Sequence, residues 1–81
     1  MITFPVINVV KTGQKIRELR IKNGLTIRDL QDKLQLATDQ GIYKWQRGIT
    51  LPSLDNMVVL ASVFCCKIDD IIVVDGDISE Y

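Results

Sequence analysis

Apolar residues recur every three or four positions along most of this chain, which is the spacing that gathers them on one side of an α-helix. In the first such segment Ile16 and Leu19 share a side, and the charged residues between them face water. Thr12 is a suitable N-cap, and Asn23-Gly24 tolerates the left-handed backbone that ends a helix. The pattern therefore predicts a helix from Thr12 to about Lys22.

The same spacing predicts a second, a fourth and a fifth helix. Thr26 can cap the second, because Asp29 follows three residues later, at the position of a capping-box partner. Ser53 can cap the fourth, and a brief fifth helix is expected over Ile68–Ile72. The expected apolar side of the second helix is Ile27, Leu30 and Leu34, and that of the fourth is Leu54, Met57, Val58, Ala61 and Phe64.

The third predicted helix is short and has two unlike sides. It is expected over residues 39–46, with Thr38 as its N-cap and Gly48 at its end. Ile42 and Trp45 are three residues apart, so they share the side that packs inward. The opposite side is polar and free to touch a partner, and it carries Gln40, Tyr43, Lys44 and Arg47.

The two ends of the chain differ from its helical middle. Residues 1–10 are rich in β-branched side chains and interrupted by Pro5, which predicts an extended arm or edge strand. Ile71–Val74 is a candidate partner strand, and residues 75–81 form a polar tail. The predicted fold is all-α, with five helices in one domain over residues 11–74 and a short β pairing between the termini.

Composition excludes several classes of function. The chain has 81 residues, enough for one small domain, and its apolar windows are too short to span a membrane. It has no histidine, so the commonest general base and zinc ligand are absent. Cys65 and Cys66 are adjacent and cannot form an unstrained disulfide, which favours the cytoplasm. We therefore expect no enzyme, no metal, no cofactor and no membrane partner.

The charge is balanced overall but divided along the chain. Residues 11–48 contain nine Lys or Arg and four acids, a balance of +5, whereas residues 49–81 contain one Lys and six acids, a balance of −5. Such asymmetry indicates a nucleic-acid partner for the basic half. The cations of the first helix are interpreted mainly as a solvated face: Lys11, Lys15, Arg17, Arg20 and Lys22.

Two short helices joined by a tight turn, the second held through one narrow apolar stripe, make the pattern of a helix-turn-helix. The segments "KIRELRIKNGLTIRDLQDKL" and "IYKWQRGITLPSLDNMVVLASVFCCKIDDII" resemble the lambda-repressor-like (Xre/Cro-type) helix-turn-helix regulators. The resemblance covers Thr12 to Val73. It departs from the family at Gln35, where a turn glycine is usual, and the turn before the third helix is one residue longer than the commonest form.

The resemblance implies a DNA-binding surface around the third helix. The positions that match residues facing bases or nearby phosphates are Thr38, Gln40, Gly41, Tyr43 and Lys44. Those that match phosphate anchors are Arg28, Arg47 and Gly48.

These features lead to two hypotheses of function. The first is sequence-specific binding of double-stranded DNA by a small bacterial or phage transcriptional regulator of the repressor type, with helix 39–46 in the major groove. It would act as a homodimer formed through the N-terminal arm, through Ile71–Val74, or through both. The alternative is an antitoxin or anti-regulator whose main partner is another protein, an idea motivated by the apolar arm.

Overall fold

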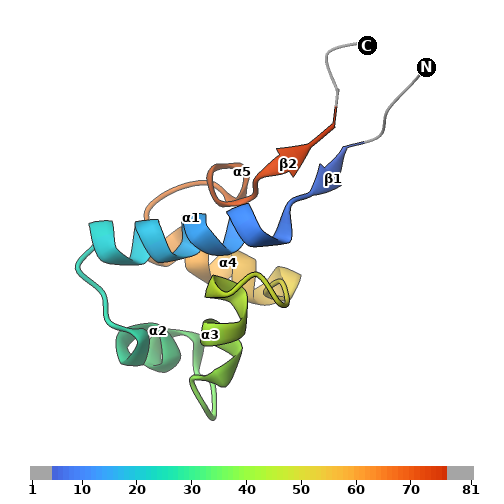
Figure 1. Ribbon diagram of the computed structural model, residues 1–81. Coiled ribbons are helices and arrows are strands. Elements are labelled where there is room, and N and C mark those ends of the chain that lie inside the picture. Colours follow the sequence, from blue (N-terminus) through green and yellow to red (C-terminus); the bar gives the residue numbers. More distant parts are fainter. Residues whose placement is uncertain (1–4, 77–81) are drawn as a thin grey trace.

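The computed structural model describes residues 5–76 and confirms the predicted fold class. Five helices are joined by short connections, and two short strands pair near the ends of the chain (Figure 1). The elements are β1 (Val6–Ile7), α1 (Val9–Lys22), α2 (Ile27–Leu34), α3 (Gln40–Gln46), α4 (Leu54–Val63), α5 (Ile68–Ile71) and β2 (Val74–Asp75). The predicted residues 1–4 of the arm and 77–81 of the tail lie outside the described part.

Helix α1 crosses the middle of the molecule, with α4 behind it and with α2 and α3 on one side (Figure 1). It contacts both α3 and α5, whereas α4 contacts α2 and α5. Strands β1 and β2 are antiparallel, with Val6 opposite Asp75 and Ile7 opposite Val74, so the termini pair as predicted. The second strand is Val74–Asp75 and not the predicted Ile71–Val74, because Ile71 is the last residue of α5 and is buried in the core. None of the helices within residues 5–76 is long and apolar enough to cross a membrane.

The first helix begins earlier than the sequence pattern predicts. Asn8, not Thr12, is its N-cap, and the Asn8 side chain accepts a hydrogen bond from the backbone N–H of Lys11 at 2.8 Å. Val9 and Val10 are therefore helical, and the described extended arm ends at Asn8. Thr12 is fully buried, and its hydroxyl accepts the backbone N–H of Val73 at 3.0 Å. The pattern misplaced this cap because Thr12 binds the far end of the chain.

The turn between α2 and α3 contains residues 35–39 and differs from the prediction at its end. Gln35 has φ of 55°, so it occupies the left-handed position where glycine is usual. The Gln31 side-chain amide donates to the carbonyl of Leu36 at 3.3 Å and supports the turn. Thr38 is not the N-cap of α3: Asp39 occupies that position with a helical backbone and makes no side-chain capping bond.

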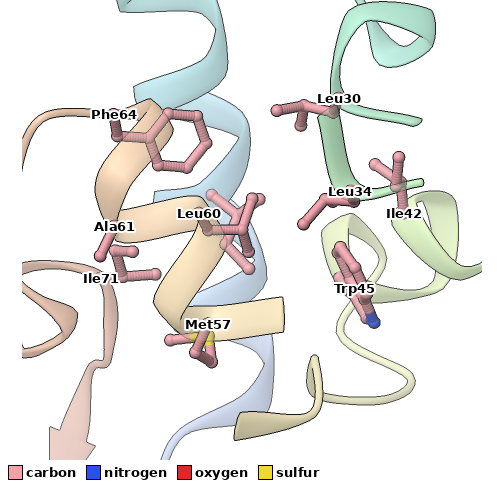
Figure 2. Close-up of a cluster of buried hydrophobic side chains, with 10 residues drawn as sticks. Leu30, Leu34, Ile42, Trp45, Met57, Leu60, Ala61, Phe64 and Ile71 are labelled. Carbon is pink, nitrogen blue, oxygen red and sulfur yellow. The ribbon is translucent and has the colours of Figure 1, made fainter. Parts of the chain in front are cut away.

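The core lies between α1, α4 and the pair α2–α3 (Figure 2). Its fully or nearly fully buried members are Ile16, Leu30, Leu34, Ile42, Trp45, Met57, Leu60, Ala61, Phe64 and Ile71. Of the other residues expected on the apolar sides, Leu19 and Ile27 are half-buried against the core, whereas Leu54 is 74% exposed and Val58 is 55% exposed. Helix α4 packs instead through the stripe centred on Met57, Leu60 and Phe64, which turns Leu54 and Val58 to the flank.

Helices α1 and α3 approach each other so closely that a side chain cannot fit between them. A Cβ atom at the buried Gly13 would lie 1.9 Å from the carbonyl oxygen of Trp45. A Cβ at Gly48, whose φ is +75°, would lie 2.8 Å from the Cα of Val10. The packing of these two helices therefore depends on glycine at both places.

We expect Ile16→Ala to lower the free energy of unfolding by about 2–5 kcal/mol, because it opens a cavity in the core. Ile21→Ala in the same helix is the matched control, since Ile16 is 0% exposed and Ile21 is 54% exposed. The control should change stability by no more than ~0.5 kcal/mol. Urea denaturation followed by circular dichroism measures both variants, and equal losses would contradict the described core.

Candidate nucleic-acid interface

The outer side of α3 forms a shallow hollow lined by four polar or charged side chains. These are Gln40, Tyr43, Lys44 and Arg47, and all four are exposed. Their spacing along the chain places them on one side of the helix. The opposite side is formed by Ile42 and Trp45, which are buried in the core (Figure 2). This helix of only seven residues thus has a buried side that fixes its orientation and a solvent-exposed side that can contact a partner.

The end of α3 is set by Gly48, as the sequence predicts. The Gly48 N–H donates to the Trp45 carbonyl at 3.0 Å, and the Ile49 N–H donates to the Lys44 carbonyl at 2.9 Å. Gly48 supplies the left-handed backbone that this helix ending requires. Arg47 is consequently held at the last turn of the helix, beside Lys44 on the exposed side.

The start of α2 is fixed by the predicted capping box. The Thr26 N–H donates to the Asp29 carboxylate at 2.8 Å, and the Asp29 N–H donates to the Thr26 hydroxyl at 3.0 Å. Bonds from the Thr26 backbone and side chain lower the pKa of the Asp29 carboxyl group. Arg28 lies two residues after the Thr26 cap and is exposed in the first turn.

The structure gathers only part of the predicted site in one place. The four side chains on α3 line the hollow together, whereas Arg28 on α2 and Thr38 in the turn are exposed on neighbouring segments. Gly41 and Gly48 are half-buried in α3 and at its end. The site is therefore a surface that spans the start of α2, the turn and the outer side of α3.

Sequence reasoning missed one residue that fixes the interface. Arg20 was interpreted as part of a solvated face, but it is half-buried between three segments. Its Nε donates to Oε1 of Gln46 at 3.1 Å, and its Nη1 donates to the carbonyl of Leu25 at 2.9 Å. Arg20 thus ties the last turn of α3 to α1 and to the turn before α2. Only the fold, which brings residues 20 and 46 together, reveals this role.

The two adjacent cysteines have different surroundings. Cys65 is exposed, and Cys66 is half-buried at the end of α4. Burial, followed by the negative charge of Asp70, raises the pKa of the Cys66 thiol, which keeps it in its weakly nucleophilic protonated form. Within residues 5–76, no three His, Cys, Asp or Glu side chains are grouped so that they could hold a metal ion.

Comparison with known proteins identifies the family. A family model described as helix-turn-helix matches residues 16–71, which is more than half of the chain. The chain belongs to this family, in its lambda-repressor-like (Xre/Cro) branch. The resemblance found in the sequence is thereby confirmed. Comparison with curated protein sequences gives no significant match.

Solved structures of helix-turn-helix regulators have the same fold. The restriction-modification controller protein C.AhdI from Aeromonas hydrophila shares 30% sequence identity, covers 78% of this chain and 94% of its own, and superposes with a TM-score of 0.69. The DNA-binding domain of BldD is 18% identical, covers 82% of this chain and 94% of its own, and has a TM-score of 0.67. The clp gene regulator ClgR from C. glutamicum is 17% identical, covers 82% of this chain and 84% of its own, and has a TM-score of 0.69. The family and fold are those of DNA-binding regulators, which are not enzymes.

The capping box predicts how the start of α2 responds to acid. Because the pKa of Asp29 is lower in the folded chain than its ordinary value of 3.8, its contribution to stability is complete above pH 3.8 and is lost as the pH falls through the lowered value. An NMR titration of the carboxyl group should give a pKa below 3.8 in the wild type. Thr26→Ala removes one of the two bonds and should raise it. An unchanged pKa in this variant would contradict the described geometry.

Proposed function

We propose that this protein is a sequence-specific, double-stranded DNA-binding regulator that places α3 in the major groove. The observation that carries the proposal is the division of α3 into a buried side and an exposed side with two cations, an amide and a tyrosine. An α-helix with its side chains is about 10–12 Å in diameter, and the major groove is about 12 Å wide, so α3 fits within it.

The side chains of the exposed stripe suit the edges of bases. Gln40, near the start of α3, can pair with the N6 and N7 atoms of adenine through its amide. Lys44 can donate to the O6 and N7 atoms of guanine or to a phosphate, and Arg47 at the last turn is suited to phosphate. Tyr43 between them offers a ring for apolar contact and a hydroxyl that can bind phosphate. Together they form a small surface able to distinguish base pairs.

The residues around these four side chains are suited to binding the DNA backbone rather than the edges of bases. Arg28 at the start of α2 is an exposed cation that can bind phosphate on one side of α3. Thr38 in the preceding turn offers a hydroxyl for the same purpose. Gly41 has no side chain, which lets the DNA backbone approach the start of α3, whereas Gly48 acts by ending the helix beside Arg47.

We further propose that the protein regulates transcription as a repressor, in the cytoplasm of a bacterium, where its DNA is found. A protein bound in the major groove over a promoter blocks access to that promoter. The 30% identity with the controller protein C.AhdI, over most of both chains, supports a regulatory role.

Lys44→Ala and Arg47→Ala should each weaken binding to any duplex DNA and reduce the slope of log K against log salt by about one phosphate contact. Lys67→Ala is the matched control, because Lys67 is an exposed cation at the start of α5, away from α3. Lys67→Ala should leave both the affinity for duplex DNA and the salt slope unchanged. Fluorescence anisotropy with a labelled duplex at several salt concentrations measures the three variants. Wild-type binding in both α3 variants would contradict the docking, and a wild type that binds no duplex would favour a protein partner.

We also propose that the protein forms a homodimer through an apolar surface that joins the β1–β2 strands to the start of α4. The exposed side chain of Val74 lies opposite Ile7 in the strand pair, and Ile7 lines an open apolar pocket together with Leu51 and Leu54, among others. This surface includes the arm residues and part of the Ile71–Val74 segment expected from the sequence. A symmetric pair of subunits would present two copies of α3 to successive turns of the major groove.

Leu54→Lys should shift the protein from dimer to monomer without unfolding it, since Leu54 is mostly exposed within one chain. Ile21→Lys is the control, because Ile21 is an exposed apolar residue at the other end of α1. Sedimentation velocity at micromolar concentrations gives the oligomeric state of the wild type and of each variant. A monomeric wild type, or a fully dimeric Leu54→Lys variant, would overturn the proposed interface.

A further inference from the structure

We propose that Gly13 is a positioning residue for DNA recognition, because it sets the angle at which α1 holds α3 toward the groove. The inference rests on the DNA-binding function proposed above. It assigns a role in specificity to a buried residue of α1 that does not itself face the DNA.

The contact that carries this inference joins two backbones. Gly13 is buried, and a Cβ atom there would lie 1.9 Å from the Trp45 carbonyl oxygen, 3.0 Å from the Trp45 carbonyl carbon and 3.4 Å from the carbonyl carbon of Gln46. All three atoms belong to the backbone of the last turn of α3, which cannot rotate aside as a flexible side chain can. The position of this turn relative to α1 is therefore fixed by the absence of a side chain at residue 13.

Two further contacts hold the same turn against the same helix. Gly48 lies against Val10, where a Cβ atom would be 2.8 Å from the Val10 Cα. At the other end, Nε of Arg20 donates to Oε1 of Gln46. Within residues 5–76, the contact between α1 and α3 is the most extensive contact between any two helices or strands. One helix thus determines the orientation of the other.

A methyl group at residue 13 would tilt α3 rather than merely loosen the core. The Trp45 carbonyl would have to retreat by about 1.1 Å to reach 3.0 Å, the shortest distance that real Cβ atoms tolerate. This carbonyl also accepts the Gly48 N–H, so the end of the helix would move with it. Functional side chains must be held to about 0.5 Å and 10–20° for a specific contact, and a shift of this size exceeds the first limit.

If Gly13 positions α3, its substitution lowers the specificity for the selected site, whereas a purely structural role would lower only the amount of folded protein. Loss of folded protein reduces binding to every duplex by the same factor. A tilted α3 keeps its charges, so binding to random DNA is largely retained while contacts with base edges are lost. The ratio of affinities for a selected site and for random duplex therefore separates the two roles.

The test compares wild type, Gly13→Ala and the neighbouring Gln14→Ala, whose side chain is exposed. The probes are a duplex selected by the wild type from a random library and a random-sequence duplex of the same length. We expect Gly13→Ala to lose about tenfold in affinity for the selected duplex, comparable to one mismatched base pair, and less than about threefold for the random one. Gln14→Ala should keep both affinities. The emission of Trp45, the only tryptophan, should shift in Gly13→Ala alone.

A second variant carries the test if Gly13→Ala does not fold. Gln46→Ala removes the bond to Arg20 without adding atoms, and it should lower the same ratio by about threefold. If Gly13→Ala folds and its ratio of affinities for the selected and the random duplex is unchanged, the positioning role of the contact between α1 and α3 is overturned. If only Gln46→Ala folds, an unchanged ratio in that variant has the same meaning. In both cases the proposed DNA-binding function stands. A wild type that selects no site from the library overturns the proposed function, and this inference with it.

Discussion

A helix of seven residues cannot hold its shape alone in water, so α3 depends on the surface against which it packs. That surface is α1, whose backbone reaches the backbone of α3 at Gly13, and the core beneath it, into which Ile42 and Trp45 insert. These contacts bury one side of α3 and leave the other side exposed. Its four polar side chains are available to a partner for this reason.

The remaining elements hold this pair of helices in place. The capping box of Thr26 and Asp29 fixes the start of α2, which packs against both α3 and α4. At the far side, the buried hydroxyl of Thr12 binds the backbone of Val73 and anchors the chain just before β2. Six of the ten acidic residues follow Ile49 in the sequence, whereas the positive excess of the first half lies mostly on α1, which carries five Lys or Arg and one Glu.

Local signals in the sequence predict much of this fold, and contacts between distant segments explain the errors. The capping box at Thr26, the cap at Ser53 and the helix end at Gly48 involve residues within one turn of each other, and all three are confirmed. Thr12 resembles an N-cap, but its partner is Val73, sixty-one residues away. Leu54 and Val58 fit the helical spacing of the core, yet the direction from which α1 and α2 cover α4 leaves them exposed. The four residues of the hollow follow from helix periodicity, whereas Gly13 and Arg20 become visible only when α1 and α3 are seen together.

We propose that the turn before α3 and the outer side of α3 form the surface that binds DNA. Backbone amide 1H–15N shifts of the labelled protein, recorded while a duplex selected from a random library is added, test it most directly. We expect the largest changes at Arg28 and in residues 38–48, and none in α4. Large changes confined to α4, α5 or the β strands, with α3 unaffected, would contradict it.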